Sequence, residues 1–162
     1  MPRGRDLWLP REMRLVSDYL VQFYPGAVHY TRMRLGSYET ASKIEGLTES
    51  EQRLLGSFRR WADAIAVTER DLVVIEGAIR PDTGEASKLM TYAELVPHTP
   101  ELREYLNREI RMELVVVVED PVVTEMCQRF GIRVVVFRPA WLQEYFDLLE
   151  WRERRPPQRR GV

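Results

Sequence analysis

Apolar positions recur with two different periods along the chain, and together they predict a fold that mixes helices with strands. Near the N-terminus apolar side chains follow the helical spacing i, i+3, i+4 and i+7, so an amphipathic helix is expected there. Five shorter runs, bounded by turn residues, are typical of strands. The helix is marked by Val16, Tyr19, Leu20 and Phe23, and the predicted strands are 28–35, 62–67, 72–79, 114–118 and 132–137.

Helix signals lie between these strands. Thr48 and Glu51 form a capping box that predicts a short helix through residue 58. Asp82, with Glu85 three positions later, is the expected N-cap of a helix over 84–96. The order of elements predicts one α/β domain with a mixed central sheet flanked by helices on both faces. Three further helices are expected to begin near Pro100, Pro121 and Pro139.

The predicted elements occupy residues 11–150, between an N-terminal arm (1–10) and a basic, proline-broken C-terminal tail (151–162). No apolar run approaches the roughly 20 residues that span a bilayer, and the first residues lack the apolar stretch of a signal peptide. We therefore expect a cytoplasmic protein with no membrane partner.

Charge and cysteine usage narrow the possible chemistry. The net charge of −1 argues against non-specific coating of nucleic acid by the whole surface, although a local basic patch is compatible with it. Among the 24 basic residues only Lys43 and Lys88 are lysines, and lysine, unlike arginine, can change its protonation state in a protein. Cys127 is the single cysteine, which excludes a disulfide within the chain and a zinc site built on paired cysteines.

A pair of carboxylates is the main candidate for chemistry. The polar residues 68–71 separate two apolar strands and predict a β-hairpin. If Val67 pairs with Leu72, Asp63 faces Glu76, with Cβ atoms roughly 4.5–5.5 Å apart. The apolar neighbours cannot relieve the repulsion between two carboxylates, whereas Mg²⁺ or Mn²⁺ would. The alternative is a structural pair held by nearby arginines, namely Arg59, Arg60 or Arg80.

This arrangement resembles the PD-(D/E)XK, or restriction-endonuclease-like, superfamily. There an Asp that enters one strand and a Glu in the adjacent strand hold the metal inside an αβββαβ core. The matching segments here are RWADA at 60–64 and VVIEGA at 73–78, and the likeness extends over residues 15–145, including the helix after the hairpin. The resemblance implies a metal-dependent nuclease in which Asp63 and Glu76 bind the metal.

The chain departs from the family pattern at two positions. Ala62 replaces the proline before the first Asp, and Ala78 replaces the lysine that orients water and stabilises charge on the phosphate. Lys88, on the following helix, is the candidate replacement, because some relatives place the lysine there; the alternative is a solvated helix lysine. Arg80 is a poorer substitute because a guanidinium cannot act as a base. A third carboxylate could come from Glu12 or Asp18.

Two functions remain open from the sequence. The first is hydrolysis of nucleic-acid phosphodiesters, with Asp63, Glu76 and Lys88 as catalytic residues. The second is a catalytically degenerate nuclease fold that serves in head completion or in neck and tail assembly of a virion, since small Arg-rich chains of this kind resemble proteins of tailed bacteriophages. Its partners would be other virion subunits, in the host cytoplasm or the virion. Nucleic-acid contacts are expected from Arg59, Arg60 and Arg80.

Overall fold

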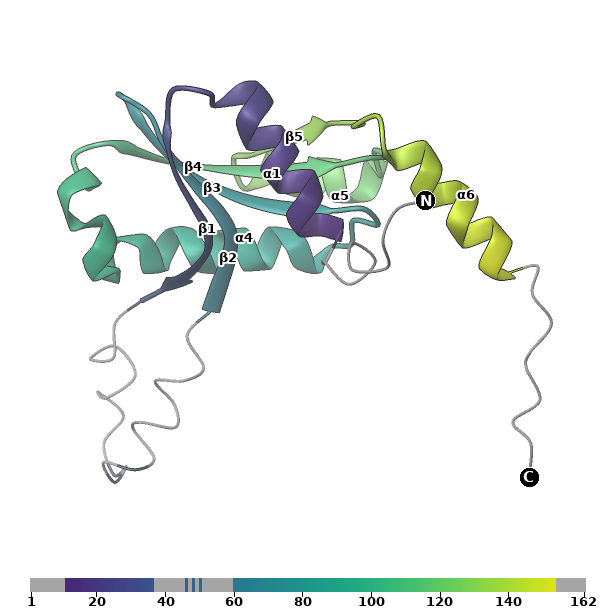
Figure 1. Ribbon diagram of the computed structural model, residues 1–162. Helices are drawn as coiled ribbons and strands as arrows, with labels where there is room; N and C mark the ends of the chain where they lie inside the picture. The colour runs from purple at the N-terminus through teal and green to yellow at the C-terminus, as the bar shows by residue number, and fades with distance from the viewer. Residues whose placement is uncertain (1–10, 37–45, 47, 49, 51–59, 154–162) are drawn as a thin grey trace.

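One mixed sheet organises the protein. The computed structural model describes residues 11–36, 46, 48, 50 and 60–153, and within them five strands lie in the order β1-β2-β3-β4-β5 (Figure 1). The first three strands pair antiparallel, and β3-β4 and β4-β5 pair parallel. The α/β fold with a mixed central sheet is therefore confirmed. The strands are β1 (Val28–Leu35), β2 (Arg60–Val67), β3 (Asp71–Ala78), β4 (Glu109–Val116) and β5 (Ile132–Val136).

Helices cover both faces of this sheet and create two cores. Figure 1 shows α1 on one face and α4 on the other. The order α1-β1-β2-β3-α4-β4 is the αβββαβ order that the family resemblance implies, so the fold is compatible with a restriction-endonuclease-like core. The helical elements are α1 (Arg11–Phe23), α4 (Gly84–Leu95), η2 (Val96–His98), η3 (Pro100–Tyr105), α5 (Pro121–Arg129) and α6 (Leu142–Glu153).

The two cores are filled by opposite faces of the central strands. Leu72 and Val74 of β3 pack in the core that contains Leu89 of α4, whereas Val73 and Ile75 pack in the core under α1. Every residue from 72 to 79 is buried, as expected for an interior strand covered on both faces. A strand with this environment provides a rigid support for the polar residues at its end.

The C-terminal helix α6 is attached to α1 by polar and aromatic contacts. The Trp141 Nε1 atom donates to Asp18 Oδ2 at 2.6 Å, and the Arg14 guanidinium lies 4.7 Å from the Trp141 ring centroid. The Arg11 guanidinium lies 3.7 Å from the ring centroid of Tyr145. The Asp18 carboxylate therefore helps to attach α6 to α1.

Several predicted details of the elements are wrong. The N-cap of α4 is Thr83 and not Asp82, whose Oδ1 atom instead accepts a hydrogen bond from the Gly84 amide at 2.6 Å. Phe23, placed on the inward stripe by its spacing, is 48% exposed. The fourth strand begins at Glu109 rather than 114 because its first residues pair with β3. The helix predicted to run from Thr48 through residue 58 lies largely outside the described residues, as do arm 1–10 and tail residues 154–162.

The β2-β3 hairpin has the predicted register. Val67 pairs with Leu72 and Ile65 pairs with Val74. The loop is closed by the Thr68 amide, which donates to the Asp71 carbonyl at 2.9 Å, and by the Asp71 amide, which donates to Thr68 Oγ1 at 2.9 Å. Because the loop fixes the register, it also fixes which residues meet at the other end of the hairpin.

None of the helices in the described ranges has the length and apolar character needed to cross a bilayer.

Candidate active site

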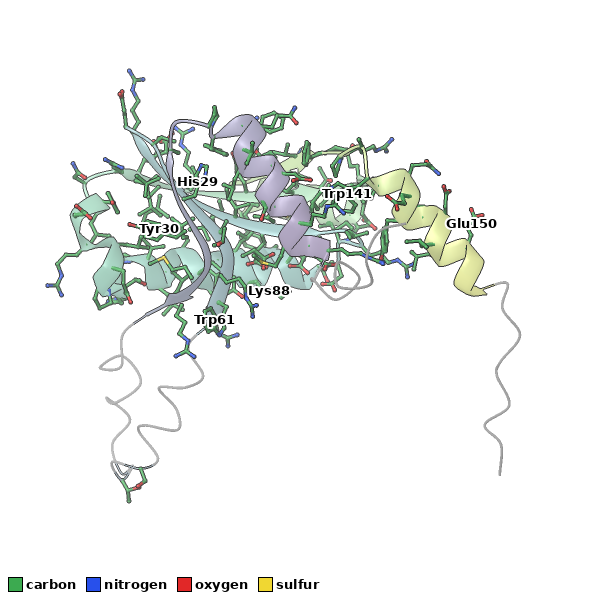
Figure 2. The ribbon with its side chains drawn as sticks, viewed as in Figure 1. His29, Tyr30, Trp61, Lys88, Trp141 and Glu150 are labelled. Atoms are coloured by element: carbon green, nitrogen blue, oxygen red, sulfur yellow. The ribbon has the colours of Figure 1, made fainter. Side chains whose placement is uncertain are left out.

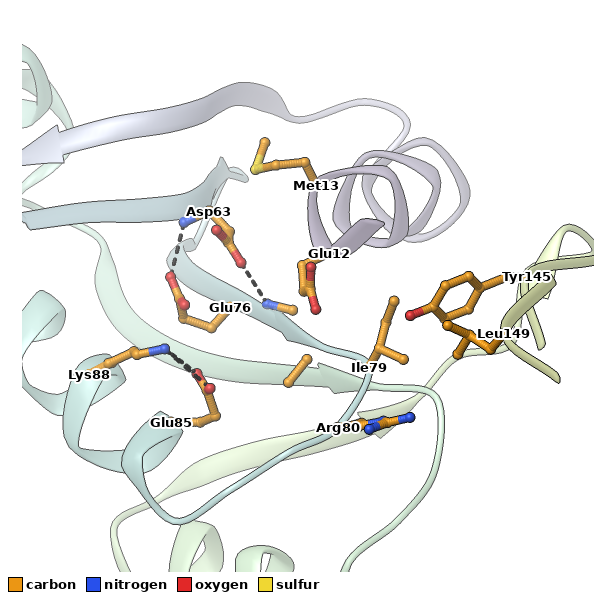
Figure 3. Close-up of a pocket in the computed structure, with 12 residues that line it drawn as sticks. Glu12, Met13, Asp63, Glu76, Ile79, Arg80, Glu85, Lys88, Tyr145 and Leu149 are labelled. Carbon is orange, nitrogen blue, oxygen red and sulfur yellow. Dashed lines mark hydrogen bonds and ion pairs between the residues drawn. The ribbon is translucent and has the colours of Figure 1, made fainter. Parts of the chain in front are cut away.

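A polar cavity of about 550 Å³ lies where the hairpin ends (Figure 3). It is bordered by the N-terminal turn of α1, the ends of β2 and β3, the first half of α4, and α6. Both members of the predicted carboxylate pair line this cavity, and so do the predicted lysine and the position of the missing one. The charged residues in its wall are Glu12, Asp63, Glu76, Arg80, Glu85 and Lys88.

Asp63 and Glu76 are locked together through the backbone. The regular pairing of β2 with β3 reaches Ala64 and Ile75. One step farther, the Asp63 amide donates to Glu76 Oε1 at 3.0 Å, and the Gly77 amide donates to Asp63 Oδ2 at 3.0 Å. Each carboxylate thus replaces a backbone carbonyl as acceptor and is oriented by the opposite strand (Figure 3). No other hydrogen bond to either carboxylate is formed within the described part of the chain, which leaves Asp63 Oδ1 and Glu76 Oε2 available to a ligand.

The two-residue alternation on which the pairing was predicted stops at Asp63. Ala64 and Ala66 belong to the core under α1, whereas Ala62 belongs to the core under α4. The opposing strand changes at the same level, because Arg32 has a φ of 50° and is absent from the otherwise continuous pairing of β1 with β2. A non-glycine residue with positive φ is uncommon and marks a local constraint. The carboxylate of Asp63 consequently reaches Gly77 on the neighbouring strand.

Gly77 allows α1 to approach the site. A Cβ atom at this position would lie 2.5 Å from Val16 Cγ2 and 3.2 Å from the carbonyl oxygen of Glu12. A Cβ contact of 2.5 Å essentially does not occur, so any residue other than glycine would require Val16 or the helix to shift. The close approach also brings the Glu12 side chain to the cavity wall.

Asp63 and Glu76 resist ionisation. Burial, and then repulsion from Asp63, raises the pKa of Glu76 to about 8, although the Asp63 amide and Lys88 oppose the shift. Burial also raises the pKa of Asp63, against the effect of the Gly77 hydrogen bond. Glu76 is 5% exposed. A cation placed between the two would remove both causes of the shift, since it favours the charged form of each carboxylate.

Lys88 lies in the cavity wall, but it is already paired. Its ammonium contacts both carboxylate oxygens of Glu85, at 3.1 and 3.2 Å. Burial lowers the pKa of Lys88, but the hydrogen bond and charge of Glu85, together with Glu76, more than compensate, so the pKa is raised. Lys88 is therefore an exposed helix lysine held in an ion pair with Glu85, and its raised pKa keeps it positively charged.

Only some of the other residues predicted for the site line the cavity. Of the two proposed third carboxylates, Glu12 lines the cavity and raises the pKa of Asp63, whereas Asp18 is bound to Trp141. Arg80 lines the cavity and is exposed. Arg60 is exposed at the start of β2, and its charge acts on Tyr92. Arg59 lies outside the described residues.

Glu85 is the site residue that the sequence reasoning missed. The sequence predicts for it only a place near a helix N-cap, yet it is buried and binds Lys88. The i, i+3 spacing of Glu85 and Lys88 was the available signal, because residues three apart are neighbours on a helix. Ala78 is buried on the same core face as Val74 and reaches the cavity wall, so the family lysine position opens onto the same space.

The donor set fits a hard divalent cation with incomplete protein ligation. In the described ranges no group of three or more His, Cys, Asp or Glu side chains converges on a metal position. Asp63 and Glu76 offer two carboxylates from adjacent strands, and Mg²⁺ is commonly held by one or two carboxylates, with water and phosphate oxygens completing the octahedron. The pair therefore suits a cation shared with a phosphate-bearing substrate better than a closed structural site.

Comparison with solved structures shows a likeness to a nuclease. The crystal structure of a repair endonuclease from Pyrococcus abyssi is similar over 78% of this chain, with 14% sequence identity and a TM-score of 0.49. The similar region covers 46% of that protein, so this chain spans about half of its length. No protein-family model and no curated protein matches the sequence.

Proposed function

We propose that this protein hydrolyses phosphodiesters of nucleic acids with the help of Mg²⁺ or Mn²⁺ bound by Asp63 and Glu76. The observation that supports the proposal is the pair itself: two adjacent carboxylates, each oriented by a backbone amide and each lining one open cavity. Two buried carboxylates side by side cannot both ionise readily without a counter-ion. A pair of this kind is therefore better explained by a ligand than by stability.

The neighbouring residues have distinct roles in this proposal. A bound divalent cation supplies Lewis-acid assistance to phosphodiester hydrolysis. Lys88 contributes positive charge next to the phosphate, and its raised pKa keeps it protonated at neutral pH, so it does not act as the base. Arg80, at the same cavity, offers a second cation for a phosphate oxygen. Glu76 must lose its proton when the cation binds, which couples binding to pH.

A second candidate function is a degenerate nuclease fold that acts as a structural subunit of a virion. The absence of an amine at Ala78 and the engagement of Lys88 by Glu85 favour it. In this role Asp63 and Glu76 would persist because they hold the end of the hairpin through two amide hydrogen bonds. Lys88 would then stabilise α4 as one i, i+3 ion pair.

Metal binding and cleavage distinguish the two functions. Calorimetric titration with Mn²⁺ should show binding to the wild type, and no binding to Asp63→Asn or Glu76→Gln. Cleavage of single- and double-stranded DNA and of RNA, with Mg²⁺ or Mn²⁺, should follow the same pattern. Glu69→Gln is the matched control, because Glu69 lies in the exposed loop of the same hairpin and should change neither property. Wild-type protein that neither binds the cation nor cleaves would contradict the proposed hydrolase and leave the structural subunit.

A further inference from the structure

An exposed tryptophan flanked by arginines lies next to the carboxylate cavity. Trp61 is 45% exposed, which is unusual for so large an apolar side chain. The next residue, Ala62, is fully buried. Arg34 is its direct neighbour on β1, and the Arg34 guanidinium lies 4.6 Å from a ring centroid of Trp61. The Arg32 guanidinium lies 5.9 Å from the same residue's ring. Figure 2 shows Trp61 at the outer end of β2.

These three residues share one surface, which faces away from the core under α4. Met33, Leu35 and Ala62 point into that core, so Arg34 and Trp61, which alternate with them, lie on the opposite side of the two strands. Arg32 belongs to the same surface because its guanidinium lies near the Trp61 ring. All three are exposed. We call them the Trp61 platform.

The Trp61 platform is connected to the cavity by geometry and by charge. Trp61 precedes Asp63 by two residues in the same strand, a separation of roughly 7 Å. Arg32, with its positive φ, interrupts the pairing of β1 with β2 at the level of Asp63, and its positive charge partly opposes the rise in the pKa of that carboxyl. A ligand bound on the platform would therefore extend directly into the space in front of the carboxylates.

We propose that the Trp61 platform binds an unpaired base of a single-stranded nucleic acid, and so selects the substrate that enters the cavity. An indole face offers stacking to any base, and flanking guanidiniums attract the adjoining phosphates. A base inside an intact duplex exposes only its edges, so a stacking platform has no use for it. This inference rests on the proposed hydrolysis, because it names the class of substrate: single strands, or duplex ends and flaps whose bases are unpaired.

Binding measured without cleavage tests the platform. Fluorescence anisotropy in EDTA would compare a labelled single-stranded DNA, its RNA counterpart and the blunt duplex of the same sequence. Trp61→Ala should weaken binding of the single strands by roughly 5- to 150-fold, the effect of removing one stacked base, while duplex binding stays unchanged. Trp61→Phe should retain most of the affinity. Phe130→Ala is the matched control, because Phe130 is 46% exposed on another part of the surface.

The outcomes separate the platform from the hydrolase. Wild type that binds no single strand, or Trp61→Ala that binds it as tightly as wild type, overturns the platform. Equal weakening of single-strand and duplex binding also overturns it, since that is the signature of lost charge or altered folding. Trp61-dependent binding in a protein that cleaves nothing supports the platform and rejects the hydrolase. Cleavage that is indifferent to Trp61→Ala rejects the platform and keeps the hydrolase.

Discussion

Replacing Glu76 by glutamine should remove a pH-dependent penalty on folding. The pKa of Glu76 is raised from the ordinary value of 4.5 to about 8, so the folded protein holds a proton that the unfolded chain has already lost. The free energy of unfolding of the wild type should therefore fall as pH rises from about 4.5 to about 8. At 1.36 kcal/mol per unit, the part of this loss between pH 6 and pH 9 is roughly 3 kcal/mol.

Glutamine does not titrate and preserves the shape of the side chain. Its oxygen can accept the Asp63 amide, and its own amide can donate to the Asp63 carboxylate. Glu76→Gln should accordingly lose the pH dependence and be more stable than the wild type at pH 9. Urea unfolding followed by far-ultraviolet circular dichroism at several pH values measures both effects. Glu69→Gln, on the same hairpin, should follow the wild type.

The same unfolding measurements can be repeated with Mg²⁺. Because Mg²⁺ competes with the proton on Glu76, the stabilisation by Mg²⁺ should be larger at pH 9 than at pH 6, and it should be absent in Glu76→Gln. Parallel stability curves for the wild type and Glu76→Gln, within about 0.5 kcal/mol across the pH range, would refute the reasoning. They would show that the carboxyl is not held in a desolvated, repulsive environment.

Substitutions at Lys88, Ala78 and Gly77 test the surroundings of the pair. Lys88→Arg should retain more cleavage activity than Lys88→Ala, because Lys88 acts as a charge; equal loss in both would indicate a role in proton transfer. Ala78→Lys should raise Mn²⁺-dependent cleavage over the wild type in a direct rate comparison, since this position opens onto the cavity. Gly77→Ala should lower the free energy of unfolding by about 1–3 kcal/mol. In a double-mutant cycle Val16→Ala should recover part of that loss, and strict additivity would contradict the steric explanation.

Much of the fold follows from local patterns in the sequence. The apolar runs and the proline and glycine punctuation predict the order of the strands and helices, and the four-residue loop predicts the hairpin register. That register places Asp63 and Glu76 at the same end of the hairpin. The length of β4 was not predictable in this way, because its first residues, such as Glu109, are polar and become strand only through pairing with β3.

The details of the site depend on contacts that no local pattern contains. The positive φ of Arg32 and the interrupted alternation at Asp63 occur at the same level of the neighbouring strands β1 and β2. The choice of Glu12 over Asp18 depends on the docking of α6, which occupies Asp18 through Trp141. The raised pKa of Lys88 required the buried neighbour Glu85 to be placed beside it. These features depend on contacts between residues distant in the sequence and on burial, so the periodicity of the sequence does not predict them.

The seat of α1 on Gly77 also limits how this site can diverge. Position 78 is open toward the cavity, so a lineage could regain a lysine there by changing that residue alone. Position 77 is different, because even a methyl group would strike Val16 and the backbone at Glu12. A larger residue at position 77 would require a compensating change at Val16 or a shift of the first helix. Natural variation should therefore be narrower at position 77 than at position 78.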